Sequence, residues 1–116
     1  MAESYRDLLV WQRSIQLSLA IYRLTIGFPK EELFGLTSQI RRAGVSVASN
    51  IAEGHGRLST GEYRQFLGMA RGSNAEIETQ LVIAKELGYG NTQVLNEAEG
   101  LAGEVGKMLN ALLKRL

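Results

Sequence analysis

Apolar residues recur along the chain at intervals of three and four positions, the spacing of one face of an α-helix. Glycines, a proline and short polar segments divide the pattern into four parts, and no run alternates with the period of two that marks a strand. The pattern predicts helices at about residues 8–26, 30–53, 60–87 and 92–115. Because helices with such short connections fold back on their predecessors, we expect an all-α, up-down-up-down antiparallel four-helix bundle that occupies residues 1–116 as one domain.

The first predicted helix carries two apolar rows. The main row is Leu8, Trp11, Ile15, Leu19, Tyr22 and Ile26, and the second row is Leu17, Ile21 and Leu24. We expect Asp7 to cap this helix, and Gly27 with Pro29 to end it, because glycine accepts the left-handed conformation and proline cannot continue the hydrogen-bond ladder. An apolar face this broad indicates that the helix has neighbours on two sides.

Small residues dominate the second predicted helix. We expect it to begin at Pro29-Lys30-Glu31-Glu32, since proline costs no hydrogen bond in a first turn and the acids complement the helix dipole, and to stop at Gly54. Its small residues are Ala43, Gly44, Ser46, Ala48, Ser49 and Ala52. They make the helix thin, so that the backbone of a neighbouring helix can approach closely.

Capping signals and a regular seam define the last two predicted helices. Ser59 and Glu62 match a capping box, Gly88 ends the third helix, and Asn91 or Thr92 caps the fourth. The expected seam of the third helix is Tyr63, Phe66, Ala70, Ser73, Ile77, Gln80, Ala84 and Leu87, flanked by Leu67, Asn74 and Leu81. At about 28 residues this helix would be roughly 42 Å long.

The composition is that of an ordinary globular domain, with 45% hydrophobic and 22% charged residues. No uncharged apolar run is long enough to span a membrane, and the polar segment at residues 1–6 lacks the apolar core of a signal peptide. We therefore expect a cytoplasmic protein without membrane contact. The absence of cysteine excludes disulfides, thiolate metal sites and thiol nucleophiles.

Catalytic and metal-binding patterns are missing from the sequence. The single histidine, His55, lies between two glycines and is interpreted as an exposed loop residue. A carboxylate metal site in a bundle would need Glu-x-x-His pairs, serine catalysis would have to recruit the same histidine, and a glycine-rich phosphate loop would have to follow a strand. We expect no catalytic residue, no metal site and no cofactor, and hence a protein that is not an enzyme.

Several motifs along the chain are distinctive in combination. They are Asp7-Leu8 with Val10-Trp11-Gln12, Phe28-Pro29-Lys30-Glu31-Glu32, the segment GLTSQIRRA at 35–43, Ser49-Asn50-Ile51-Ala52-Glu53-Gly54 with Gly56-Arg57, Gly72-Ser73, Glu76 with Glu78-Thr79-Gln80-Leu81, and Leu87-Gly88-Tyr89. Together they resemble the bacterial four-helix-bundle proteins of the 23S ribosomal RNA intervening-sequence type, and the resemblance covers nearly the whole chain.

This resemblance implies a four-helix bundle that assembles as a ring-like homopentamer and has no established enzymatic activity. Some members of the family are encoded within the intervening sequences of 23S ribosomal RNA genes. A more distant relative, the accessory variability protein of diversity-generating retroelements, uses a basic surface to bind nucleic acid and a reverse transcriptase. The present chain is less basic than the retroelement relatives.

Positive charge is concentrated in the first two thirds of the chain. Residues 1–75 hold nine basic and six acidic residues, whereas residues 76–116 hold four basic and six acidic ones. The candidate phosphate ligands are Arg41, Arg42, Arg57, Arg64 and Arg71. Arginine suits bidentate phosphate contacts, and copies from several subunits would add their fields and bind RNA or DNA. The alternative is a solvated face, with Arg41 or Arg42 paired to Glu76 or Glu78.

A second group of polar residues is interpreted as structural. Its members are Asn50, Glu53, Ser73, Glu76, Glu78 and Gln80, which we expect to form a network that sets helix register or subunit packing. The sequence thus leaves two hypotheses for function. The first is an oligomeric bundle that binds nucleic acid, and the second is a structural or protein-binding oligomer without nucleic-acid affinity.

Overall fold

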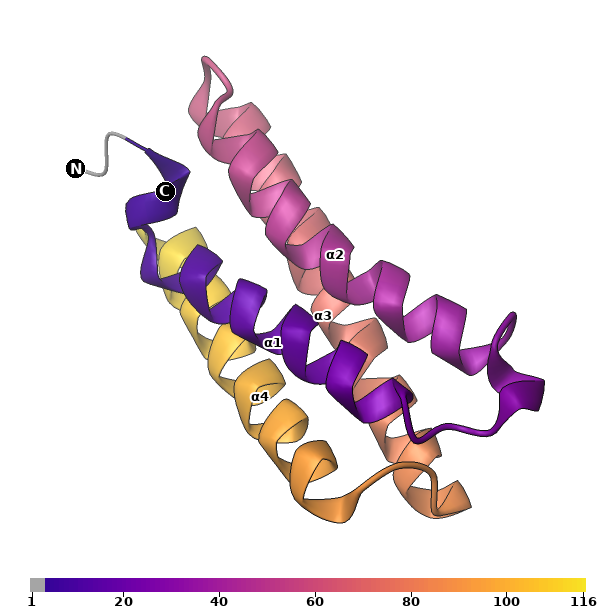
Figure 1. The fold of residues 1–116 in the computed structure, drawn as a ribbon. Helices are drawn as coiled ribbons and strands as arrows, with labels where there is room; N and C mark the ends of the chain where they lie inside the picture. The colour runs from indigo at the N-terminus through magenta and orange to yellow at the C-terminus, as the bar shows by residue number, and fades with distance from the viewer. Residues whose placement is uncertain (1–3) are drawn as a thin grey trace.

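Four helices fold back on one another in the computed structural model, which describes residues 4–116 (Figure 1). Their bounds are α1 (Leu9–Thr25), α2 (Leu36–His55), α3 (Thr60–Leu87) and α4 (Thr92–Arg115), and two short 3-10 helices are η1 (Tyr5–Asp7) and η2 (Lys30–Glu32). No β-strand occurs between residues 4 and 116. The expected all-α architecture is confirmed, and the first three residues of the expected domain lie outside the described part.

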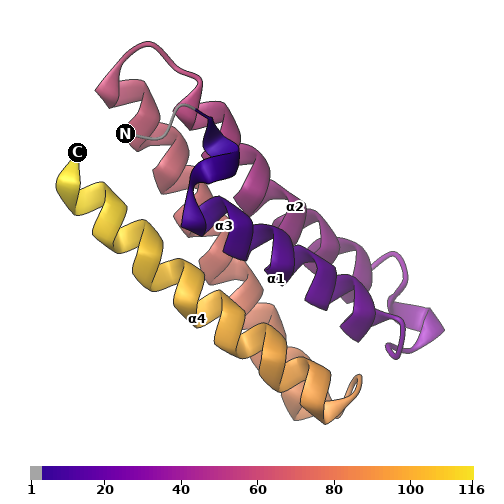
Figure 2. The same ribbon diagram turned by 60° about the vertical axis from the view of Figure 1, so that its left-hand side comes forward.

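Successive helices run in opposite directions (Figures 1 and 2). Each helix contacts two others, while the diagonal pairs α1/α3 and α2/α4 stay apart over residues 4–116. The molecule measures 43 × 24 × 20 Å. Its long axis matches α3, whose 28 residues span about 42 Å at the usual rise. None of the helices in the described part is long and apolar enough to cross a membrane.

Aliphatic side chains from all four helices fill the interior. The largest fully buried ones are Leu17, Ile21, Leu24, Ile40, Val47, Ile51, Leu67, Ile77, Leu81, Val105 and Leu109. Burial of this apolar surface is the main force that holds the helices together.

The prediction for the main face of α1 is wrong. Leu17, Ile21 and Leu24, expected as a secondary row, are the buried ones, whereas Leu19 and Ile26 of the expected main row are 55% and 80% exposed. Both rows have helical spacing, so the pattern alone could not say which faces the core. The exposed row leaves apolar surface on the outside of the subunit.

The seam of α3 is likewise rotated from the predicted one. The buried row is Leu67, Ala70, Asn74, Ile77, Gln80, Leu81 and Ala84. Tyr63, Phe66 and Ser73 are half-buried, and Leu87 is exposed. The residues expected to flank the seam therefore lie at its centre, while Ala70, Ile77 and Ala84 belong to both the predicted and the observed row.

One predicted cap and one predicted helix start are wrong. Asp7 lies in η1, which Ser4 caps, and α1 begins after Leu8 without a side-chain cap. The segment after Pro29 forms η2, so α2 begins at Leu36. There the Glu32 carboxylate accepts a hydrogen bond from the Leu36 amide at 3.1 Å, which replaces the missing side-chain cap.

Of the three glycines predicted to end helices, only Gly88 does so in the left-handed conformation. Gly88 has φ 73° and ends α3 as expected, whereas Gly27 is not in the left-handed region. Gly54 does not stop α2. It is buried inside the helix, and a Cβ at this position would lie 2.7 Å from Cβ of Phe66 and 3.1 Å from Cδ1 of Tyr63. The absence of a side chain therefore lets α2 and α3 approach each other.

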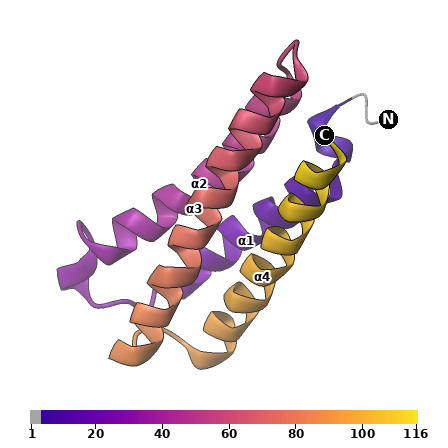
Figure 3. The same cartoon turned by 180° about the vertical axis from the view of Figure 1, so that it is seen from behind.

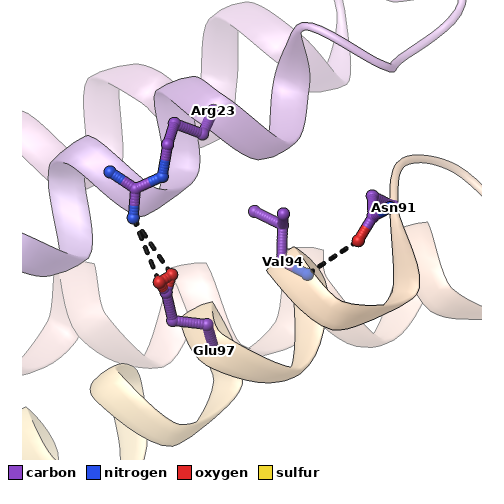
Figure 4. Close-up of polar contacts among 4 residues, drawn as sticks. All are labelled: Arg23, Asn91, Val94 and Glu97. Atoms are coloured by element: carbon purple, nitrogen blue, oxygen red, sulfur yellow. Dashed lines mark hydrogen bonds and ion pairs between the residues drawn. The ribbon is translucent and has the colours of Figure 1, made fainter.

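Side-chain caps at the starts of α3 and α4 are confirmed. Ser59 Oγ accepts from the Glu62 amide at 3.1 Å and donates to the Glu62 carboxylate at 3.2 Å. Asn91 Oδ1 accepts from the Gln93 amide at 2.9 Å and from the Val94 amide at 3.1 Å, the second of which is drawn in Figure 4. These caps explain why the predicted bounds of α3 and α4 agree with the structure.

Replacing Gly54 with alanine should lower the free energy of unfolding by about 1–3 kcal/mol, because the new methyl group meets Phe66 and Tyr63. Gly72→Ala is the matched control: nothing lies within 4 Å of a Cβ there, so alanine should raise stability by about 0.5–1 kcal/mol. Urea denaturation followed by circular dichroism measures both changes. Stabilisation by both substitutions would contradict the close approach at Gly54.

Candidate nucleic-acid interface

The five candidate arginines lie at three separate places on the subunit. Arg41 and Arg42 are on the first half of α2, Arg57 follows the end of α2, and Arg64 and Arg71 are on the first half of α3. A single subunit therefore does not gather all five. Their convergence would require several copies of the chain.

Arg41 is held against α1. Its Nε donates to Thr25 Oγ1 at 2.8 Å, and its guanidinium lies 4.7 Å from the centre of the Tyr22 ring. Stacking and hydrogen bonding orient the side chain without neutralising its charge. Arg42 is exposed beside it, and both line a surface hollow of about 420 Å³ together with Leu33 and Phe34. Neither arginine contacts Glu76 or Glu78 within the subunit.

Arg57 belongs to a local ion pair at the end of α2. Its Nη2 lies 3.3 Å from Glu53 Oε2, and its guanidinium lies 4.6 Å from the centre of the Phe66 ring. Such exposed pairs contribute about 0.2–1 kcal/mol. Glu53 thus partly offsets the charge of this arginine. Its carboxylate pairs with a residue four positions along the chain and does not contact the other members of the predicted polar network.

Arg64 and Arg71 reach across from α3 to α4. Arg64 Nη1 donates to the Leu113 carbonyl at 2.6 Å, and Arg71 Nη1 donates to Asn110 Oδ1 at 3.2 Å. Figure 3 shows the start of α3 and the end of α4 at the same end of the bundle. Between these helices lies a groove of about 480 Å³, which we call the α3–α4 groove. Its lining residues are Arg64, Gly68, Arg71, Asn110, Leu113 and Lys114.

Lys114 is the functional candidate that sequence reasoning missed. It lies on a different helix from the arginines, more than forty positions along the chain from Arg71. The signal in the sequence was its spacing of four from Asn110, which places both on one face of α4. The spacing points to a shared site only because this face of α4 lies beside Arg64 and Arg71.

Three basic residues elsewhere on the subunit are neutralised by carboxylates of α4. Arg13 pairs with Glu104 at 2.7 Å, and Lys85 pairs with Glu99 at 3.7 Å. Arg23 donates to both carboxylate oxygens of Glu97, at 3.0 and 3.1 Å (Figure 4). By contrast, no ion pair within residues 4–116 involves the three cations of the α3–α4 groove.

Part of the expected polar network lies between α2 and α3. The hydroxyls of Ser46 and Ser73 are 2.9 Å apart, and Asn50 Nδ2 donates to the carbonyl and the hydroxyl of Ser46, each at 2.9 Å. The structure thus brings Asn50 and Ser73 together through Ser46, which the prediction had treated only as a small residue. The contact fixes the two helices side by side.

The remaining members of the predicted network are dispersed. Gln80 is buried and its Nε2 donates to Glu76 Oε2 at 3.1 Å, while Glu78 is exposed and forms no hydrogen bond or ion pair within the described part of the chain. Asn74, which was not predicted as a network member, is buried and donates to the Ala102 carbonyl at 2.9 Å. Polar contacts therefore join α3 to α2 and, separately, to α4.

His55 is not an exposed loop residue. It is the last residue of α2, is half-buried, and lies edge-on to Tyr63 with the ring centres 5.9 Å apart. Burial raises the pKa of the Tyr63 hydroxyl. No group of three His, Asp or Glu side chains in residues 4–116 is arranged to hold a metal ion.

Comparison with known proteins identifies the family. Residues 6–111 match the model of the family described as 23S rRNA-intervening sequence protein. A crystal structure of a protein with unknown function from the S23 ribosomal protein family of Bacteroides thetaiotaomicron shares the fold, with a TM-score of 0.81 and 22% identity over 91% of this chain and 99% of that one. No curated protein matches the sequence. The chain belongs to the family of 23S rRNA-intervening sequence proteins.

Proposed function

We propose that the protein is a non-enzymatic cytoplasmic scaffold that assembles into an oligomer and binds nucleic acid through its unneutralised arginines. The observation that carries the proposal is that some basic side chains form ion pairs with carboxylates and others do not. Arg13, Arg23 and Lys85 are matched by carboxylates of α4, whereas Arg64 and Arg71 face only neutral acceptors. Unneutralised arginines repeated on several subunits would create a strong positive field.

Exposed apolar residues support self-assembly. On and beside α1 they are Leu19 (55% exposed), Tyr22 (42%), Ile26 (80%), Leu33 (51%) and Phe34 (93%). A second group lies on the last part of α3 and comprises Val82, Ile83 and Leu87. Exposed apolar surface of this kind marks an interaction site.

Charge makes these two apolar surfaces complementary. Arg41 and Arg42 lie beside the first, and the exposed acids Glu78 and Glu86 lie beside the second. Two different surfaces that match each other give a head-to-tail contact, which closes into a ring when the rotation between subunits permits. We propose that the ring holds five copies, the number implied by the resemblance to the family.

Removing apolar side chains from the first surface should weaken assembly. In the double variant Ile26→Ser and Phe34→Ser, the mass measured by light scattering should fall toward that of one chain, while circular dichroism stays helical because both residues are exposed. Leu58→Ser is the control, since Leu58 is fully exposed in the α2–α3 connection. A native protein that is monomeric at all concentrations would contradict assembly.

Binding of nucleic acid should depend steeply on salt, because displaced counterions drive it. Replacing Arg42, Arg64 and Arg71 together with glutamine should lower the affinity for a labelled RNA or DNA and reduce the slope of log affinity against log salt by about two to three. Arg23→Gln is the control, since Glu97 already neutralises this arginine. Fluorescence anisotropy measures both quantities.

Absence of binding at low salt, or an affinity that does not change with salt, would contradict the nucleic-acid part of the proposal. The exposed apolar surfaces would then favour the second hypothesis, a structural or protein-binding oligomer. Light scattering on the same samples separates the two parts, since assembly and nucleic-acid binding are measured independently.

A further inference from the structure

The α3–α4 groove combines three full positive charges with no carboxylate in its lining. Arg64 and Arg71 come from α3 and Lys114 comes from the last turn of α4. The negative end of the α4 dipole, equivalent to roughly half an elementary charge, offsets only part of this excess. A groove with this balance attracts anions.

Both arginines are oriented across the groove and still have free donors. A guanidinium carries five N–H groups, and hydrogen bonds to α4 are formed by Nη1 of Arg64 and by Nη1 of Arg71. The remaining donors suit the bidentate contacts that arginine makes with phosphate oxygens. Because α4 already holds these side chains, less conformational freedom is lost when a ligand binds.

Capping of α4 alone does not account for the arrangement. Arg64 does bond to a carbonyl near the end of α4, but Arg71 bonds to a neutral side chain more than one turn before the helix ends, and Lys114 adds a third charge. Gly68 leaves the groove open between the arginines, since nothing lies within 4 Å of a Cβ at that position. The result is an open site rather than a filled contact between helices.

We propose that the α3–α4 groove is a phosphate-binding site, complete in each subunit, in which Arg64, Arg71 and Lys114 bind a ligand that carries more than one phosphate group. The two arginines begin about 10.5 Å apart along the axis of α3, and their guanidinium groups bond to acceptors three residues apart on α4, so the groove offers more than one contact point for phosphate groups. Such phosphates come from a nucleic-acid strand or from a free polyphosphate. The inference deepens the proposed function, because it locates the phosphate contacts within one subunit.

Calorimetric titration of the full chain with inorganic tripolyphosphate and, separately, with a short single-stranded oligonucleotide tests the site. Lys114→Gln and Arg64→Gln should each weaken binding of the ligand by about tenfold. Arg115→Gln is the matched charge control. Arg115 is adjacent in sequence but lines a different hollow with Leu8 and Met108, so its loss should change the affinity less than about twofold.

A steric variant tests the position of the ligand without changing charge. Gly68→Leu places a side chain in the groove and should also weaken binding about tenfold, whereas Gly72→Leu, at an equally open position outside the lining, should leave it unchanged. Both substitutions improve helix propensity, so both variants are expected to fold, which circular dichroism verifies.

The outcomes separate this inference from the proposed function. Tripolyphosphate binding that Gly68→Leu blocks, with no oligonucleotide binding, would support the groove and contradict nucleic-acid binding. Oligonucleotide binding that is insensitive to Gly68→Leu and Lys114→Gln would support the proposed function and overturn the groove. Equal effects of Lys114→Gln and Arg115→Gln would overturn it as well, and binding of neither ligand would overturn both.

Discussion

The close approach of α2 to its neighbours is the constraint on which the arrangement of the bundle depends. At Gly54 a Cβ would lie 2.7 Å from Phe66 on α3, and at Gly44 a Cβ would lie 3.1 Å from Ile21 on α1. A larger side chain at either place would push a helix outward. The hydrogen bond between Ser46 and Ser73 also requires that α2 and α3 lie close together. The thin second helix therefore determines how α3 is placed and rotated.

Rotation of α3 in turn decides which of its side chains meet α4. The buried row passes through Leu67 and Asn74, and Arg64 and Arg71 each precede one of these residues by three positions. Residues three apart are neighbours on a helix surface, so both arginines lie directly beside the buried row. This is why their guanidinium groups reach acceptors on α4 and form one side of the groove.

Much of the fold could be predicted from the sequence where local chemistry decides the outcome. The bounds of α3 and α4 followed from Ser59, Gly88 and Asn91, whose caps depend on residues a few positions away. The rotations of α1 and α3 could not be predicted, because each helix offers two apolar rows and the choice depends on packing against other helices. In the candidate site, the spacing of seven predicts that Arg64 and Arg71 lie on the same face of one helix. Lys114 lies far from them in the sequence and comes beside them only because α3 and α4 pack together.

The exposed glycines of α3 bear on how the groove would respond to a ligand. Gly68 and Gly72 have no neighbouring atoms that would exclude a side chain, yet each weakens the helix by about 1 kcal/mol relative to alanine. The first half of α3 is thus less stable locally than its length suggests, and this segment carries both groove arginines. A ligand that bridges α3 and α4 would bind only the closed helix and would therefore suppress local opening of the segment.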